Sequence, residues 1–594
     1  MSNSLFRTKK IANILAEDND AHGGGGLKRV LGVRDLTFFG IAAILGAGSF
    51  SSLGGAVFHG GPGVIILFVI TAIACAFTAF CYSEFASRIP VAGSAYTYAY
   101  ASFGELFAWI IGWALIMEYS IGNIYVAYSW SDYFTSFMDK CGMHIPEYLS
   151  TSYMEAKHAI TDGSTNENLL TAWNTAPKIG SIKIILDFPA LIINLLITYL
   201  VYRGVKESRN FSNLMVILKL IVVMLIIFVG GYLVFSNGLT TNWRPVNDAG
   251  IKSFMPNGFG GVMMAVSGVF FAYIGFDAVS VLAEESKNPQ RDLPKGMMLS
   301  LVICTVIYIL LTLVLTGAVN YRNFDGVGDP LAFIFEPQNL NIGWMQFLVA
   351  ICAVVAMTSV LLVFQMGQPR IWMSMSRDGL MPPKFQKIHP KYKTPSFATI
   401  ITGLVVGVPI LFTDKTFVLD FTSIATLFAF VLVCGGVLLL PKKEKTPGRF
   451  SLPYINGQFI FPLIVIGSMV LLAVLSKNYF TNLFNFDFSK NEEYITHKLS
   501  FMDVALPNIS LIIFWSSALI LSVVTLFKKY SLIPLMGLIT CMYLLTGMTK
   551  NNWAWFLGWL ALGLIVYFLY SFKHSKLSPK NAAVIPNVSE GSAQ

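Results

Sequence analysis

The chain has 594 residues, of which 55% are hydrophobic and only 12% are charged. Its mean hydropathy of +0.64 excludes an ordinary soluble protein, because so much apolar surface needs a lipid environment. The net charge of +9 does not indicate nucleic-acid binding. About two thirds of the 41 Lys and Arg residues lie in segments on the cytoplasmic side when the N-terminus is inside. This positive-inside bias predicts that both termini are cytoplasmic.

Apolar stretches along the chain predict about fourteen membrane-spanning helices, so the expected fold class is an all-α polytopic membrane protein. Polar or charged segments separate these stretches. Numbered in chain order, the spans are expected at 36–58, 63–89, 105–137, 184–202, 210–235, 258–285, 297–320, 344–376, 396–412, 416–440, 457–475, 508–527, 531–548 and 552–572.

Spans 1 and 6 carry helix-breaking sequence where a membrane helix should be continuous. Gly46-Ala47-Gly48-Ser49 interrupts span 1, and the stretch 270–277 interrupts span 6. An unpaired backbone amide or carbonyl costs several kcal/mol inside a bilayer, so irregular backbone is tolerated only where it lines a cavity or a ligand. If each break opens one half of an inverted repeat, the two breaks face each other near the midplane. That layout is typical of the substrate site of a secondary transporter.

The same layout divides the chain into five parts. They are a cytoplasmic N-terminal segment (1–35), a first transmembrane repeat (36–235), a second repeat (258–440), four accessory spans (457–572) and a cytoplasmic tail (573–594). The N-terminal segment has no apolar core, so we expect no cleavable signal peptide. The outer loop 138–183 is expected to form an irregular or partly helical cap, and the tail to be disordered.

A broken helix leaves backbone amides and carbonyls without partners inside the helix. Free amides at the start of the outer half of span 1 suit a carboxylate, and free carbonyls at the end of the first half of span 6 suit an ammonium. An α-amino acid presents both groups, one carbon apart. The expected groups are the amides of Ala47, Gly48 and Ser49 and the carbonyls of Phe271, Ala272 and Ile274. The alternative is that the glycines only permit close helix packing.

The breaks and the cytoplasmic loops resemble the amino acid–polyamine–organocation (APC) superfamily, and within it the bacterial part of the cationic amino acid transporter branch. The resemblance extends from about residue 27 to residue 572 and is most specific at 81–90 (CYSEFASRIP), 270–294, 367–370 (GQPR) and 375–380 (MSRDGL). It implies a LeuT-like core of five plus five spans, related as an inverted repeat. Two features depart from the family: Ser49 stands where an isoleucine is usual, and 457–527 adds a hairpin.

Lys219 lies roughly ten residues into span 5, near the middle of the membrane at ~1.5 Å per residue. A charge there costs on the order of 3 kcal/mol, which makes the lysine a functional candidate, and desolvation favours its neutral form. In the resembled family a lysine in the pattern Asn213-x-x-Val216-x-x-Lys219 occupies the place of a sodium ion. The resemblance therefore implies proton coupling without sodium. The alternative is a snorkelling or permanently paired structural lysine.

Two acidic residues and two apolar ones complete the expected site. Glu118 in span 3 and Asp277 after the span 6 break would make the pocket acidic, able to hold a cationic side chain or relay a proton. Alternatively, they are structural partners of Lys219 or of exposed backbone amides. Met357 in span 8 is expected to face the cavity, although a methionine in a span often only packs. Ile44, just before the first break, is assigned to the same pocket.

Together these features predict a proton-coupled importer of L-amino acids working by alternating access. The branch resemblance favours arginine, lysine or ornithine. The alternatives are an exchanger, an importer of small neutral amino acids such as alanine, and a non-transporting amino acid sensor. An enzyme is not expected, because no metal cluster, Ser-His-Asp set or phosphate-cradling loop occurs.

The predicted setting is the bacterial inner (plasma) membrane. The expected partners are the amino acid and the lipid bilayer, with no nucleic acid. No cofactor and no metal are expected, and the proton serves as the coupling ion. The sequence leaves open whether a small membrane subunit or a second copy binds.

Overall fold

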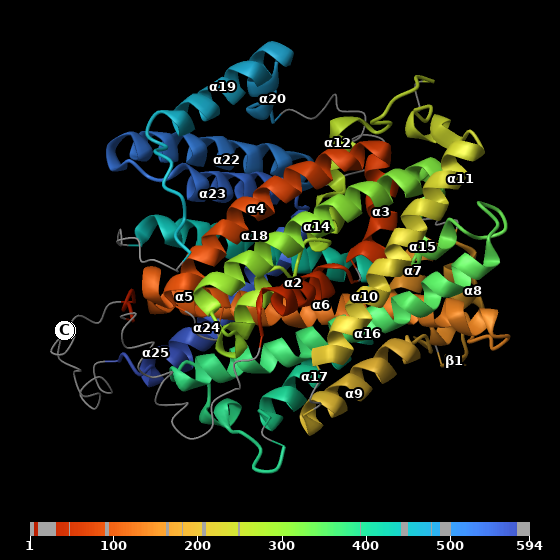
Figure 1. The fold of residues 1–594 in the computed structure, drawn as a ribbon, viewed down its shortest axis with the longest axis horizontal. Coiled ribbons are helices and arrows are strands. Elements are labelled where there is room, and N and C mark those ends of the chain that lie inside the picture. Colours follow the sequence, from red (N-terminus) through yellow and green to blue (C-terminus); the bar gives the residue numbers. More distant parts are fainter. Residues whose placement is uncertain are drawn as a thin grey trace.

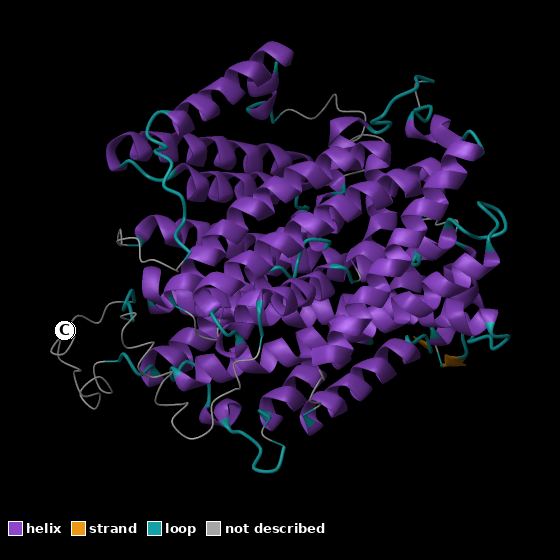
Figure 2. Ribbon diagram, in the orientation of Figure 1, coloured by secondary structure: helices purple, strands orange, loops and turns teal. Residues whose placement is uncertain are grey.

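The structure is a computed structural model, and most of the residues that it describes are helical (Figure 2). The described residues are 5–9, 31–46, 48–89, 94–161, 166–180, 182–204, 209–247, 250–392, 394–440, 450–476, 478–486 and 501–578. Among them, two short strands, β1 (Lys178–Ile179) and β2 (Ile182–Lys183), form an antiparallel ribbon with Ile179 opposite Ile182.

Each of the fourteen predicted spans coincides with helical segments. Spans 1 to 5 contain α2 (Val33–Ile44), η1 (Gly48–Ser52) and α3 (Leu53–Gly60); α4 (Val64–Arg88); α6 (Glu105–Lys140); α9 (Phe188–Arg203); and α10 (Arg209–Leu225), η4 (Ile226–Gly230) and α11 (Gly231–Ser236). Spans 6 to 10 contain α12 (Gly258–Met264), α13 (Val266–Phe271) and η6 (Asp277–Glu285); α14 (Pro289–Ala318); α16 (Gly343–Arg377); α17 (Ser396–Ile410); and α18 (Lys415–Leu439).

The accessory spans contain α19 (Ile460–Leu475), α22 (Phe501–Lys528), α23 (Leu532–Leu545) and α24 (Lys550–Val566), the last continued by η9 (Tyr567–Ser571) and α25 (Phe572–His574). Shorter helices are α5 (Ser94–Ser102), α7 (Tyr153–Thr161), α8 (Glu167–Thr175), α15 (Pro330–Phe333) and α20 (Tyr479–Leu483). Single turns occur at η2 (Gly61–Gly63), η3 (Glu147–Leu149), η5 (Leu239–Trp243), η7 (Tyr321–Phe324) and η8 (Pro383–Gln386).

The described helices confirm the predicted fold class, with broken helices at spans 1 and 6. Eight helical runs are long and apolar enough to cross a membrane, and four shorter apolar helices accompany them. The count of fourteen spans remains a prediction. In Figure 1, α4 and α14 lie side by side, and α14 also packs on α2. On the other side of the breaks, α6 packs along α16 and α18.

The hairpin of α19 and α22 stands at the edge of the bundle (Figure 1). With α23 it encloses a second apolar cluster that includes Phe461, Trp515 and Leu535, separate from the main core. The extra hairpin is therefore attached beside the ten-span core and does not enter the site.

The outer loop between α6 and α9 forms the partly helical cap that the sequence predicts. α7 and α8 pack on each other around a small core of Ala156, Ala172 and Ile185. In Figure 1, α8 and β1 lie at the end of the bundle opposite to α5 and α25.

The described segments nearest to the two termini, 5–9 and 575–578, meet at one end of the bundle. Arg7 Nη2 lies 3.1 Å from Glu105 Oε1 at the start of α6, and Ser575 Oγ donates to Oε2 of the same carboxylate. Lys9 Nζ lies 2.9 Å from Asp378 Oδ1 after α16. The described terminal segments thus share one side, as predicted. Residues 579–594, most of the predicted tail, lie outside the described part of the chain.

Candidate functional site

The two helix breaks contact each other through their backbones. A Cβ atom on Gly48 would lie 2.5 Å from the Cα of Ala272, which no real side chain can occupy. Gly275 has φ +117°, and a Cβ atom there would lie 2.9 Å from the Cβ of Ala43. The glycines therefore do permit close approach, and they do so between spans 1 and 6 at the breaks. This contact confirms that the breaks face each other.

Hydrogen bonds inside the first break hold its irregular shape. The amide and the hydroxyl of Ser49 both donate to the carbonyl of Gly46, at 3.1 and 3.0 Å. Ser52 Oγ donates to the carbonyl of Gly48 (2.6 Å) and reaches the carbonyl of Gly268 (3.0 Å), linking spans 1 and 6. The Ser49 amide, predicted to be free for a carboxylate, is thus engaged in this conformation. Ala47 lies outside the described residues.

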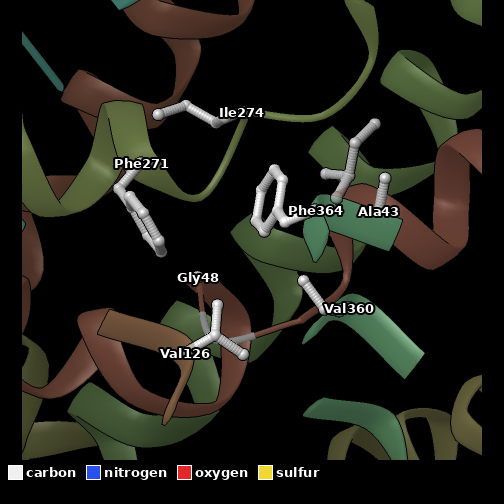
Figure 3. Close-up of a pocket in the computed structure, with 8 residues that line it drawn as sticks. Ala43, Gly48, Val126, Phe271, Ile274, Val360 and Phe364 are labelled. Atoms are coloured by element: carbon white, nitrogen blue, oxygen red, sulfur yellow. The ribbon is translucent and has the colours of Figure 1, made fainter. Parts of the chain in front are cut away.

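A small cavity lies between the breaks, α6 and α16. It is lined by Ala43, Ile44, Gly48, Val126, Phe271, Ile274, Val360 and Phe364. Figure 3 shows the rings of Phe271 and Phe364 and the side chain of Val126 around this space. None of the lining side chains carries a charge or a hydrogen-bonding group, so the polar groups available here belong to the backbone.

Four predicted site residues line the cavity, and two lie beside it. Ile44, Gly48, Phe271 and Ile274 are in its wall. Ser49 and Ala272 are buried next to wall residues in the chain. This placement agrees with a site built on the two breaks, while the binding roles assigned to these residues remain predictions.

Met357 is fully buried in α16 but is not part of the wall; Val360 and Phe364 are. These three residues are spaced three and four apart, so they share one helix face. Met357 therefore lies on the same face of α16 as the two wall residues, about one helical turn before Val360. Ala43 and Val126 were missed altogether. Val126 stands two helical turns beyond Glu118, or about 12 Å at ~1.5 Å per residue.

Glu118 and Asp277 are buried but do not line the cavity. The carboxylate of Asp277 lies close to backbone amides at the start of η6, including those of Gly275 and Ala278. Glu118 lies near the hydroxyl of Thr426, which donates to the carbonyl of Thr422, and its Oε2 has no partner among the described residues. The structure therefore favours the alternative for Asp277, a partner of exposed amides. Glu118 is a buried carboxyl group with spare hydrogen-bonding capacity.

Lys219 of span 5 contacts the end of the first half of span 1. Its side chain is 1% exposed, and Nζ donates to the carbonyls of Ala42 (3.1 Å) and Leu45 (3.0 Å). These partners are carbonyls at the C-terminal end of α2, not carboxylates. The lysine is therefore linked to the end of α2 next to the first break and forms no hydrogen bond or ion pair with Glu118 or Asp277 among the described residues.

A tyrosine that the sequence reasoning missed contacts both breaks. The hydroxyl of Tyr308 in α14 lies 2.8 Å from the carbonyl oxygen of Ile44 and 2.7 Å from that of Ala272. A buried tyrosine hydroxyl usually has a hydrogen-bond partner, so a tyrosine inside an apolar span is the signal that pointed here.

Outside the cavity, a short series of contacts covers it. The ring of Tyr125 packs edge-on against Phe271, with centroids 4.6 Å apart. Lys415 Nζ lies 5.7 Å from the centre of the Tyr125 ring and forms an ion pair with Asp132 of α6. It is also 3.5 Å from the carbonyl of Gly328. These contacts link α6, α18 and the segment around Gly328 beside the cavity.

Comparisons with known proteins give concordant matches. A sequence model of the amino acid permease family matches residues 31–487. The chain is 36% identical to the branched-chain amino acid permease BcaP of Bacillus subtilis (strain 168), over 97% of this chain and 100% of that protein. It is 33% identical to the methylthioribose transporter of the same strain, over 97% and 99%. It is 34% identical to the vacuolar cationic amino acid transporter 4 of Arabidopsis thaliana, over 74% and 67%.

Proposed function

The chain belongs to the amino acid permease family, and on this premise we propose that it carries neutral amino acids with apolar side chains, foremost the branched-chain ones, across a membrane. The family makes it a transporter rather than an enzyme. The observation that carries the substrate proposal is the uniformly apolar wall of the cavity between the breaks.

An α-amino acid matches the two kinds of group found there. The backbone of the breaks supplies the polar partners for the α-carboxylate and α-ammonium. Val126, Val360 and Phe364 supply an apolar surface for the side chain. Burying a branched aliphatic side chain against such a wall contributes roughly 1.5–3 kcal/mol. One relative with full-length similarity is named a branched-chain amino acid permease, which supports the same substrate class.

The cationic preference expected from the branch resemblance remains a prediction, and relatives named cationic amino acid transporters keep it in view. It would need a carboxylate within reach of the substrate side chain. Glu118 and Asp277, the two candidates, are not in the wall. A lysine or arginine side chain would therefore enter an apolar cavity unpaired, which is costly. Small neutral amino acids such as alanine fit the wall chemistry and stay an alternative, as does exchange.

We further propose that Lys219 couples transport to protons. Its ammonium bridges span 5 to α2, and a neutral amine would hold the two carbonyls more weakly. Release of the proton therefore frees α2 to move, and rebinding returns it. This cycle needs no sodium. The location we propose is the bacterial inner membrane with both termini inside, supported by the charge bias and by relatives from a bacterium.

The proposal is tested with purified full-length protein and then with vesicles. L-leucine, L-isoleucine and L-valine should raise the melting temperature, whereas L-arginine, L-lysine and 3-methylbutylamine, which is leucine without its carboxylate, should not. Uptake of labelled leucine into vesicles should be displaced by isoleucine but not by a 100-fold excess of arginine. Displacement by arginine and not by isoleucine would restore the cationic assignment.

A further inference from the structure

Tyr308 lies where the two broken helices meet, although it belongs to neither of them. It comes from span 7, is fully buried, and has its ring fixed between Phe68 (centroids 5.6 Å apart) and Tyr273 (5.5 Å, planes at 87°). The hydroxyl lies between the carbonyl oxygens of Ile44 and Ala272.

One hydroxyl hydrogen is shared between these two acceptors, since a tyrosine carries a single donor. The acceptors are not equivalent. The carbonyl of Ile44 also accepts from the amide of Gly46, at 2.9 Å. The carbonyl of Ala272 receives, among the described residues, only the Tyr308 hydroxyl. The buried carbonyl at the span 6 break is therefore incompletely satisfied, and such a group carries a desolvation penalty.

We infer that Tyr308 is a positioning residue that holds the Ala272 carbonyl in place of substrate and yields it to the substrate's ammonium, turning its hydrogen to Ile44 instead. This inference rests on the proposed amino acid substrate. An ammonium brings three donors, so its arrival satisfies Ala272 completely while Tyr308 keeps Ile44 attached to α14. The hydroxyl thus holds the Ala272 carbonyl when the site is empty. When substrate is bound, it donates to Ile44 and keeps span 1 attached to α14.

The matched pair of variants is Tyr308→Phe and Tyr273→Phe. Both remove one hydroxyl from neighbouring buried rings, but the hydroxyl of Tyr273 donates to Phe68 (3.1 Å), a carbonyl in the helix α4. Without its competitor, Ala272 should bind the ammonium better. L-leucine should therefore bind Tyr308→Phe about threefold to tenfold more tightly, and Tyr273→Phe within about twofold of the wild type. In vesicles, Tyr308→Phe should lower both KM and maximal rate, because tighter binding slows release.

Equal or weaker binding of leucine by Tyr308→Phe overturns the inference, as does an equal gain in Tyr273→Phe. If the Tyr308→Phe protein cannot be produced in folded form, replacement of Tyr308 by 3-fluorotyrosine is the second test. Its hydroxyl is a stronger donor, so leucine should bind more weakly, and unchanged or tighter binding counts against competition. The proposed function is judged separately: it fails if the wild-type protein binds no amino acid, whereas the inference is judged by the ratio of variant to wild type.

Discussion

The Nζ atom of Lys219 lies 3.0 Å from the carbonyl oxygen of Leu45, the residue that caps the inner half of span 1. It also lies 3.1 Å from the carbonyl of Ala42, so one side chain of span 5 serves two groups at the C-terminal end of α2. Helix C-termini carry partial negative charge, and a cation there contributes about 0.3–1 kcal/mol, more when it is partly buried. The inner half of span 1 is therefore held most firmly when Lys219 is charged.

Lys219→Ala should abolish accumulation of leucine driven by an acid-outside gradient while leucine binding falls less than about tenfold, because the cavity wall is untouched. Lys219→Arg should also lose gradient-driven accumulation, since arginine does not release its proton. Uptake and binding are measured on the same preparations, with Lys252→Ala, an exposed loop lysine, as the control. Wild-type pH dependence in Lys219→Ala would make the lysine structural and leave Glu118 as the next candidate.

Gly48→Ala should prevent the two breaks from packing, because the new methyl group would lie 2.5 Å from the Cα of Ala272. We expect loss of leucine binding together with a lower melting temperature. Gly55→Ala is the matched control. It lies in α3, and no atom stands within 4 Å of its added methyl group, so it should be neutral or gain up to about 1 kcal/mol in helix propensity. Normal leucine binding by Gly48→Ala would contradict the close contact.

Lys415→Met should open the outer route, since the charge that pairs with Asp132 and reaches the Gly328 carbonyl is lost. The readout is alkylation of Ser51→Cys by a membrane-impermeant maleimide, with the exposed Cys141 replaced by serine. Ser51 is buried beneath these groups and donates to the same Gly328 carbonyl. Labelling should become faster, and exchanging the charges (Asp132→Lys with Lys415→Asp) should slow it again. Equal labelling rates with and without Lys415 would show that the ion pair does not close this route.

Glu155 in the outer cap predicts a pH effect. Burial, followed by the nearby charge of Asp132, raises the pKa of Glu155 to about 8. The folded cap thus binds this proton more tightly than the unfolded chain does. The stabilisation of the folded cap by this proton is fully present below the ordinary pKa near 4.5 and is lost as the pH rises toward 8.

Glu155→Gln removes that loss, so its melting temperature should exceed that of the wild type at pH 9 by more than it does at pH 5. Glu167→Gln, at an exposed position on α8, serves as the control and should show no such difference. A constant offset between Glu155→Gln and the wild type at both pH values would mean that Glu155 is already ionised in the folded cap.

The sequence alone determined the parts of the protein that depend on local chemistry. Long apolar runs need lipid, and the stretches 46–49 and 270–277, which contain Gly46, Gly48 and Gly275, interrupt the helices, so the spans and both breaks were predictable. Lys219 was also predictable, because a lone charge deep in a span must have a partner or a purpose. The cap was foreseen only in outline.

Only the tertiary structure decided which side chains surround the cavity. Glu118 and Val126 are on the same helix, and nothing in the chain's pattern shows that the breaks lie at the level of Val126. The same holds for Met357 against Val360 and Phe364. The depth at which α6 and α16 meet the breaks depends on backbone contacts across the repeats, such as Gly48 on Ala272.

The two-acceptor contact of Tyr308 has the same origin. In the chain, Tyr308 is 264 positions from Ile44 and 36 positions from Ala272. No local period in the sequence encodes such contacts. The sequence thus determined that the helices break, because the backbone's own preferences are local. The fold decided what occupies the breaks, because that depends on how distant helices pack.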